Sequence, residues 1–138
     1  MHKSLSFIAE QTETDAVYLY KNSDNNDYFL RVHSAPDIQE QLDSAPKHYS
    51  YSKSGLMDWY NSLKNEEVID SNTSKLEDLE RSFMNKYGIQ SMLIIPIHLD
   101  NHYYGFLGFD NRKSVTTWSD LEKNILLSFA KKLGYFLQ

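Results

Sequence analysis

The chain has 138 residues, of which 41% are hydrophobic and 14% aromatic, with 14 Lys and Arg against 19 Asp and Glu. A domain of this length buries about 68–70% of the surface of its extended chain, enough for one core without disulfides or metals. The aromatic content excludes a disordered or fibrous chain, and the net charge of −5 gives no electrostatic reason to bind nucleic acid or anionic lipid.

The sequence contains no Cys, which excludes disulfides, thiolate nucleophiles, Cys-rich metal sites and thioether-linked cofactors. Its longest apolar run, residues 92–99, is interrupted by Pro96 and His98 and is too short to span a bilayer. Polar residues follow the first apolar stretch too soon for a signal peptide. We therefore expect a cytoplasmic domain that makes no membrane contact.

The first third of the chain predicts a helix followed by a hairpin. Residues 4–12 carry a short apolar stripe suited to a helix. Residues 17–20 and 28–32 are rich in aromatic and β-branched side chains and flank the polar run 22–27, which is typical of two strands joined by a loop. Residues 34–54 show no periodicity and predict no element.

Two helices are expected in the middle of the chain. The first is predicted by apolar residues at helical spacing, namely Leu56, Trp59, Tyr60 and Leu63. Residues 67–70 form a short candidate strand. The second helix is predicted to begin with a capping box of Ser74 and Glu77 and to end at Gly88, with Leu76, Leu79, Phe83 and Tyr87 inward and Glu80 and Lys86 outward.

The clearest elements lie near the end of the chain. Residues 91–99 and 102–109 predict a hairpin closed by Asp100 and Asn101, a pair that tolerates positive φ. Gly105 and Gly108 inside the second strand indicate a bulge or a close backbone approach.

A final helix is predicted from the capping box Ser119 and Glu122. Its apolar residues cover more than one face, and no stop signal precedes the end of the sequence. This pattern favours a helix that continues or meets a partner, and a chain cut from a longer protein.

The order helix, hairpin, helix, strand, helix, hairpin, helix favours an α+β domain with a central antiparallel sheet of five to six strands. No linker, repeat or composition shift divides the chain, so residues 1–138 are predicted to form a single domain.

The same order resembles a GAF domain, the ligand-sensing and dimerisation module found beside histidine kinase, diguanylate cyclase or PAS regions in bacterial signalling proteins. The resemblance rests on three segments in order, residues 89–97, 105–110 and 118–122, followed by the last helix. Residues 15–20 and Trp59 fit it too. It implies N- and C-terminal helices on one face of the sheet, and middle helices that enclose a pocket on the other.

By this resemblance, the residues expected to face or rim the pocket are Trp59, Asp70, Phe83, Tyr87, Ser91, Leu93 and Ile95. Plain core packing is the alternative for each aromatic residue. The residues expected to mediate dimerisation through the terminal helices are Leu5, Phe7, Ile8, Leu126, Leu133 and Leu137.

The resemblance leaves the cofactor open. Bilin-binding and sulfoxide-reducing relatives use Cys, which is absent here. Relatives that bind cyclic nucleotides carry an Asn-Lys, Phe, Asp-Glu constellation, which Asn111, Arg112, Trp118 and Glu122 match only in part, with Lys123 where Glu is usual. Arg112 and Glu122 would preserve an opposite-charge pair, which favours a structural clamp over a nucleotide contact. Haem held by one His stays open.

Neither a metal site nor a catalytic centre is predicted. His98 and His102 would alternate faces of the hairpin and could not share one ion. The acidic groups 24–27, 66–70 and 77–80 lack a calcium-loop pattern and are expected on the surface. No nucleophile motif or P-loop occurs.

The sequence therefore predicts a non-enzymatic sensor module. An unidentified small molecule would bind the pocket and shift the middle helices, and the terminal helices would transmit the shift to an output domain of the same parent chain, within a homodimer. The alternative is a ligand-free module that only dimerises.

Overall fold

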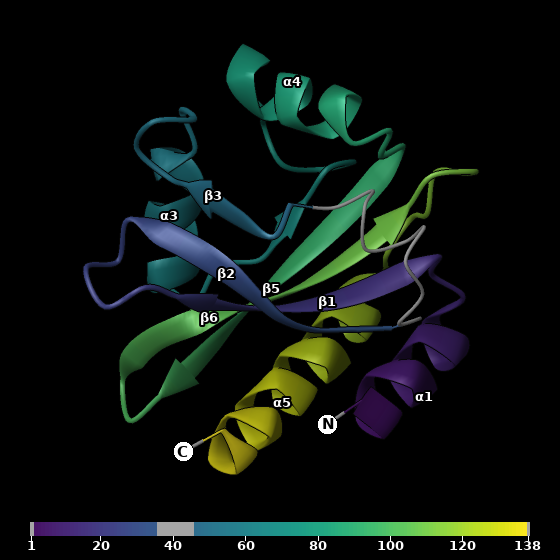
Figure 1. Cartoon of the computed structure of the whole chain (residues 1–138). Helices are drawn as coiled ribbons and strands as arrows, with labels where there is room; N and C mark the ends of the chain where they lie inside the picture. Colours follow the sequence, from purple (N-terminus) through teal and green to yellow (C-terminus); the bar gives the residue numbers. More distant parts are fainter. Residues whose placement is uncertain (1, 36–45, 138) are drawn as a thin grey trace.

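An antiparallel sheet separates two layers of helices (Figure 1). The computed structural model describes residues 2–35 and 46–137, and within them the sheet has six strands in the order β3-β2-β1-β6-β5-β4. The strands are β1 (Ala16–Asn22), β2 (Tyr28–Ala35), β3 (His48–Ser50), β4 (Ile69–Asp70), β5 (Ser91–Leu99) and β6 (His102–Asn111). The helices are α1 (His2–Thr12), α3 (Met57–Lys64), α4 (Asp78–Lys86) and α5 (Asp120–Phe136).

The terminal helices α1 and α5 cover one face of the sheet, and α3 and α4 lie over the other (Figure 1). Alternating side chains of the central strands therefore enter two separate cores, because successive residues of a strand point to opposite faces. Val17, Leu93 and Leu107 pack with the terminal helices, whereas Tyr18 and Ile94 pack with the middle ones. The predicted α+β architecture is confirmed, down to the shared side of the two end helices.

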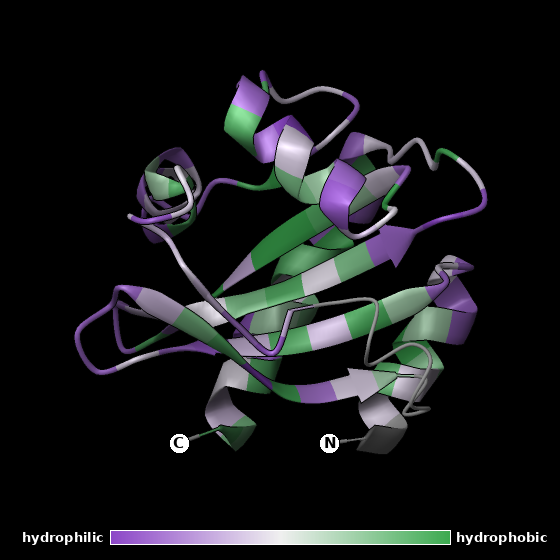
Figure 2. Ribbon diagram, turned by 45° about the horizontal axis from the view of Figure 1, so that its top comes forward, coloured by the Kyte–Doolittle hydropathy of each residue, from purple (hydrophilic) through white to green (hydrophobic). Residues whose placement is uncertain are grey.

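Hydrophobic residues concentrate in the central strands, and hydrophilic residues in the loops (Figure 2). The long β5–β6 hairpin shows this most clearly, since β5 is buried from Ser91 to Ile97. Asp100 and Asn101 both adopt positive φ, 49° and 65°, so the predicted tight turn is confirmed. His98 pairs with Tyr103 and Leu99 with His102, as the turn position requires.

Gly105 marks a close approach of two backbones. The β5–β6 register shifts after Ile97, which pairs with Gly105, and Tyr104 is the extra residue of a bulge. A Cβ at Gly105 would lie 2.0 Å from the carbonyl oxygen of Tyr20 on β1. Gly108 differs, because the nearest atoms to its Cβ position are 3.9 Å away. The prediction of a bulge or close approach is confirmed at Gly105 only.

The two predicted capping boxes have different outcomes. At α5, the Ser119 hydroxyl accepts from the Glu122 N–H (3.1 Å) and the Glu122 carboxylate accepts from the Ser119 N–H (2.9 Å), as predicted. At α4, the prediction was wrong by three residues. The N-cap is Glu77, whose N–H donates to Glu80 Oε1 at 2.8 Å. The Ser74 hydroxyl instead accepts from the Asp70 N–H at 3.0 Å, within the turn after β4.

The unpatterned stretch contains the short edge strand β3, which pairs with β2. Residues 36–45 of that stretch lie outside the described residues. The segment after β3 is held by a buried hydroxyl network. Tyr51 Oη donates to Asn22 Oδ1 at 2.6 Å and lies 3.0 Å from Tyr103 Oη. These contacts are far apart in sequence, which explains why no local pattern predicted this segment.

Candidate ligand pocket

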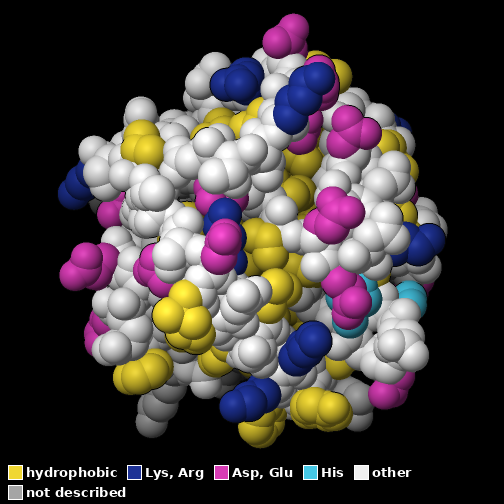
Figure 3. Space-filling model, turned by 180° about the vertical axis from the view of Figure 1, so that it is seen from behind, with side chains coloured by type: hydrophobic (Ala, Val, Ile, Leu, Met, Phe, Trp, Pro, Cys, Tyr) yellow, Lys and Arg dark blue, Asp and Glu magenta, His cyan; other side chains and the backbone are white. Residues whose placement is uncertain are grey.

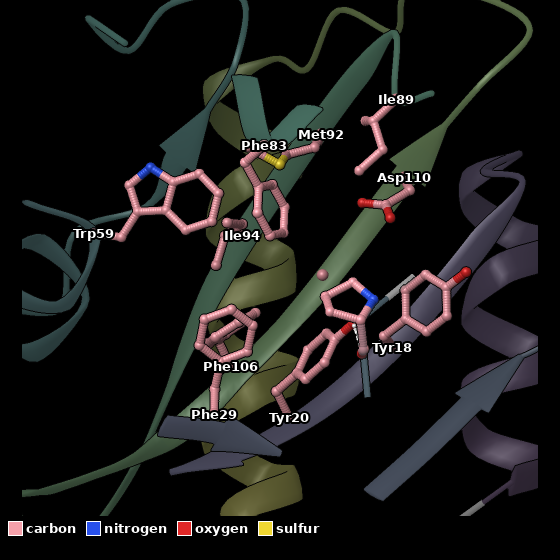
Figure 4. Close-up of a pocket in the computed structure, with 12 residues that line it drawn as sticks. Tyr18, Tyr20, Phe29, Trp59, Phe83, Ile89, Met92, Ile94, Phe106 and Asp110 are labelled. Atoms are coloured by element: carbon pink, nitrogen blue, oxygen red, sulfur yellow. Dashed lines mark hydrogen bonds between the residues drawn. The ribbon is translucent and has the colours of Figure 1, made fainter. Parts of the chain in front are cut away.

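A cavity lies between the sheet and the middle helices (Figure 4). Its floor comes from the even-numbered positions of β1, β5 and β6, which the register brings side by side. Tyr18 pairs with Gly108, Tyr20 with Phe106, and Met92 with Asp110. Phe29 of β2, Trp59 of α3 and Phe83 of α4 contribute further walls. The complete lining is Tyr18, Tyr20, Phe29, Pro46, Trp59, Phe83, Ile89, Met92, Ile94, Phe106, Gly108 and Asp110.

Half of the twelve residues that line the cavity are aromatic. The Tyr20 ring lies 5.0 Å from that of Phe106 and 5.2 Å from that of Phe29, between centroids. The rings of Trp59 and Phe83 meet edge to face at 5.1 Å. The free volume of the cavity is about 20 Å³, room for a water-sized group. A larger ligand therefore requires the walls to move.

Asp110 is the charged residue of this lining, and its carboxyl group points into the cavity (Figure 4). It is 7% exposed, and its Oδ2 lies 3.7 Å from Nη2 of Arg112. Burial raises the pKa of Asp110 to about 7, with Asp15 adding to the rise and the Arg112 guanidinium opposing it. Asp110 can therefore exist both as a neutral acid and as a carboxylate near neutral pH.

Three other polar groups belong to the lining. The Tyr18 hydroxyl accepts a hydrogen bond from Arg112 Nη2 at 3.4 Å, and the Tyr20 hydroxyl donates to the Pro46 carbonyl at 3.2 Å. Burial raises the pKa of Tyr20 well above its ordinary value, so this phenol stays protonated. Trp59 Nε1 is buried and has no hydrogen-bond partner among the residues that the structure describes.

The sequence-predicted pocket residues divide into those at the cavity, those on the opposite face of β5, and Asp70 and Ser91 at the strand ends. Trp59 and Phe83 line the cavity, and Tyr87 stands behind Phe83 with its ring 5.1 Å away. Leu93 and Ile95 lie on the opposite face of β5, in the core beneath α1 and α5. Strand alternation is the cause, since these odd-numbered positions cannot share a face with Met92 and Ile94.

Asp70 and Ser91 tie the strand ends to the start of the last helix. Asp70 Oδ2 lies 2.9 Å from Nζ of Lys123 in the first turn of α5, and the Asp70 side chain is almost completely buried. The Ser91 hydroxyl accepts from the Thr116 N–H at 3.0 Å. Glu80, like Asp70, is buried rather than on the surface, so the expectation for these two acidic residues was wrong. The helix cap of α4 explains the burial of Glu80.

The residues that resemble the cyclic-nucleotide constellation have structural roles here. The Asn111 side chain accepts from the Asp15 N–H at 2.8 Å and donates to the Thr116 hydroxyl. Arg112 pairs with Asp110, and Glu122 caps α5. The expected pairing of Arg112 with Glu122 is therefore replaced by two separate interactions.

The residues expected to mediate dimerisation are largely internal. Leu5, Leu126 and Leu133 lie in the core under the terminal helices, and Ile8 and Leu137 are partly buried against it. Of the six residues, Phe7 is the most accessible, at 60%. The outer face of α5 instead presents Leu121, Ile125, Tyr135 and Phe136. Hydrophobic side chains also reach the surface at the end of the molecule near both termini (Figure 3).

Sequence reasoning missed Tyr18, Tyr20 and Asp110. The sequence does contain a signal for these residues. The two hairpins are predicted, and in a strand side chains alternate between faces, so Tyr18 and Tyr20 must share one face of β1. The strand pairing that sets Asp110 beside the other two was the missing information.

Within residues 2–35 and 46–137, no helix is long and apolar enough to cross a bilayer. The same residues contain no group of three or more His, Asp or Glu side chains arranged to hold a metal ion.

An antiparallel sheet with a helix-covered cavity on one face and the two terminal helices on the other defines this chain as a small α+β domain (Figure 1). Residues 1–136 match the GAF domain family, and the chain belongs to that family. It is 26% identical over 139 residues to the methanogenesis regulatory histidine kinase FilI of Methanothrix harundinacea. That match covers 94% of this chain and 15% of the kinase.

Solved structures share the fold at low sequence identity. A domain of a putative two-component sensor histidine kinase from Sinorhizobium meliloti superimposes with a TM-score of 0.70 at 14% identity, covering 99% of this chain and 87% of that one. The GAF3 domain of Slr1393 from Synechocystis gives 0.78 at 16% identity, covering 99% and 90%. The phycocyanobilin-bound GAF domain of a cyanobacterial phytochrome gives 0.79 at 12%, covering 99% and 81%.

Proposed function

We propose that this chain is the small-ligand-sensing module of a cytoplasmic signal-transduction protein, and that its terminal helices carry the signal to an output domain such as a histidine kinase. The observation that carries the proposal is the buried Asp110 carboxyl group aimed into an otherwise aromatic and aliphatic cavity. Concave apolar sites with a few polar anchors are typical of ligand pockets. The Arg112 guanidinium, 3.7 Å away, offsets only part of the cost of burying this charge, because the pKa of Asp110 stays raised.

The proposed route of transmission runs through the sheet and its edge. Cavity residues of β5 alternate with residues that pack against α5, so a ligand that displaces the strand also displaces the helix. Asp70 and Lys123 join the strand before α4 to the first turn of α5. A ligand shifts the equilibrium by its difference in affinity for the two arrangements.

A pocket-filling variant tests the sensing function. Gly108 lines the cavity, and its Cβ position is open, so Gly108→Val places a side chain in the free volume. We expect compounds from a thermal-shift screen to raise the melting temperature of the natural domain by a few degrees and that of Gly108→Val by much less. Native mass spectrometry would verify binding. A screen without hits, or hits that stabilise both proteins equally, would contradict sensing at this cavity.

The rival function is a ligand-free dimerisation module. It is favoured by the small free volume of the cavity and by the exposed stripe Leu121, Ile125, Tyr135 and Phe136 on α5. Leu121 lies four positions before Ile125, and Tyr135 and Phe136 lie ten and eleven positions after it. At about 3.6 residues per turn, all four side chains fall on one side of the helix. These exposed residues, rather than Leu126 and Leu133, are the candidates for contact with a second copy.

Light scattering of the purified domain tests the dimer. We expect a concentration-dependent dimer that Ile125→Glu converts to a monomer, because the new charge enters an apolar contact. Leu79→Glu is the matched control, since Leu79 is equally exposed (59% against 58%) but lies on α4. A monomer at every concentration, or equal effects of the two substitutions, would contradict dimerisation through α5.

A further inference from the structure

The chemistry of the cavity wall restricts the ligand. Six of the lining residues are aromatic, namely Tyr18, Tyr20, Phe29, Trp59, Phe83 and Phe106. The face of an aromatic ring carries partial negative charge, and rings that surround one space stabilise a cation placed there. A neutral guest gains only apolar contact with these rings, and an anionic guest is repelled by them.

The lining adds one charged group, and it is acidic. Asp110 contributes its carboxyl group, while no Lys, Arg or His is found among the described residues that line the cavity. The carboxyl oxygens point toward the space between the rings (Figure 4). Apart from the 3.7 Å contact to Arg112, the residues that the structure describes supply this carboxyl group with no ion pair.

Charged groups also lie behind the cavity wall. Asp15 and Arg112 lie at the same end of the sheet, where the Arg112 N–H donates to the Asp15 carboxylate at 2.7 Å. The Arg31 guanidinium lies 6.0 Å from the centroid of the Tyr18 ring. These two cations stand outside the lining, and the Arg112 guanidinium also donates to the Tyr18 hydroxyl and the Tyr87 carbonyl at 3.4 Å each.

We propose that the cavity binds a small alkylammonium ion, with the aromatic rings around its alkyl groups and the Asp110 carboxylate against its nitrogen. This inference rests on the proposed sensing function and names the class of ligand. The free volume of about 20 Å³ holds only a water-sized group, so a guest of a few heavy atoms can enter only if the walls move apart. The aromatic wall and the inward carboxylate both favour a cation over an isosteric alcohol or a carboxylate.

Binding also couples to a proton. Burial raises the pKa of Asp110 to about 7, so the empty pocket holds a mixture of acid and carboxylate near neutrality. An ammonium ion interacts favourably with the carboxylate form alone, and its binding should release the proton. Affinity should therefore rise with pH up to the range where Asp110 is ionised. Among the described residues, Asp15, Arg112 and the Tyr20 hydroxyl interact electrostatically with this carboxyl group, while Arg31 lies over the Tyr18 ring.

Three probes of matched size, isopropylammonium, 2-propanol and acetate, test the proposal by NMR-detected titration of the intact chain. At about pH 8, isopropylammonium is expected to bind at least about ten-fold more tightly than 2-propanol, and acetate more weakly than either. At about pH 5.5 the affinity for isopropylammonium should fall about ten-fold or more, while that for 2-propanol stays constant.

Two variants assign the preference to named groups. Asp110→Asn should lower the ratio of ammonium to alcohol affinity about ten-fold, and Asp24→Asn, in an exposed loop, should leave it unchanged. Phe106→Leu keeps apolar bulk but lacks a ring, and it should lower the same ratio several-fold. Because the ratio is measured within one protein, a general loss of stability cancels.

The possible failures are distinct. Equal binding of the ammonium ion and the alcohol, a preference for acetate, or an unchanged ratio in Asp110→Asn would overturn the alkylammonium assignment and leave a ligand-binding cavity intact. Absence of binding by all three probes, with hits of other chemistry in the thermal-shift screen, would overturn the assignment alone. Absence of binding in both experiments would overturn the sensing function as well.

Discussion

Replacing Gly105 with alanine is expected to destabilise the domain by about 3 kcal/mol or more, because the new methyl group has no room. Its Cβ would lie 2.0 Å from the Tyr20 carbonyl oxygen and 2.9 Å from the carbonyl carbon. Both atoms belong to the backbone of β1, at the centre of the sheet, and cannot move aside as a flexible side chain would. The paired strands β1 and β6 would have to move apart.

Gly108→Ala is the matched control. This glycine lies three residues further along β6, and the nearest atoms to its Cβ position, at 3.9 Å and 4.0 Å, belong to side chains. We expect a change within about 1 kcal/mol, since the methyl group enters free volume. Urea unfolding of the three proteins measures both effects. Equal stability of Gly105→Ala and the natural chain would show that the β1 and β6 backbones do not approach each other this closely.

The second large effect is a pH dependence that belongs to Asp110. Its pKa is about 7 in the folded domain, against 3.8 for an ordinary aspartate, so between these values the folded state binds more protons than the unfolded state. Stability should therefore fall as pH rises through this window and level off above it. A shift of this size corresponds to a loss on the order of 4 kcal/mol, as an upper value.

Asp110→Asn removes the titrating group while keeping the shape of the side chain. We expect the variant to lack this decline, so that the difference in unfolding free energy between the two proteins changes by a few kcal/mol between about pH 4.5 and pH 8. Comparing the proteins cancels the contributions of other carboxyl groups, such as Asp27, whose pKa is lowered by a hydrogen bond from Ser52. Asp24→Asn is the control for an exposed carboxylate. If the unfolding free energies of Asp110→Asn and the natural chain depended on pH in the same way, the raised pKa of Asp110 would be contradicted.

Local patterns predicted the elements of this fold well where local interactions decide them. The Asp100–Asn101 turn fixed the register of β5 and β6, and Ser119 with Glu122 fixed the start of α5. The helix near Trp59 followed from its spacing. In each case the decisive hydrogen bonds or contacts join residues a few positions apart.

The site was harder to predict because tertiary pairing decides it. Leu93 and Ile95 belong to the predicted strand but face the terminal helices. The position of Asp110 beside Met92 depends on strand pairing, which no local pattern of the sequence indicates. Asp70 and Glu80 were expected at the surface, as acidic residues usually are. The partner that accounts for Asp70, Lys123, lies more than fifty positions away, on a different element.

The division of each central strand into two sets of side chains has an evolutionary consequence. If the cavity binds a ligand as proposed, substitutions at Tyr18, Met92 or Ile94 would change its specificity, while Val17, Leu93 and Leu107 would keep their contacts with the end helices. The proposed recognition and the proposed output could therefore diverge separately along one polypeptide segment. A library that randomises only the even positions should yield new specificities in domains that still fold and still dock their helices in the same way.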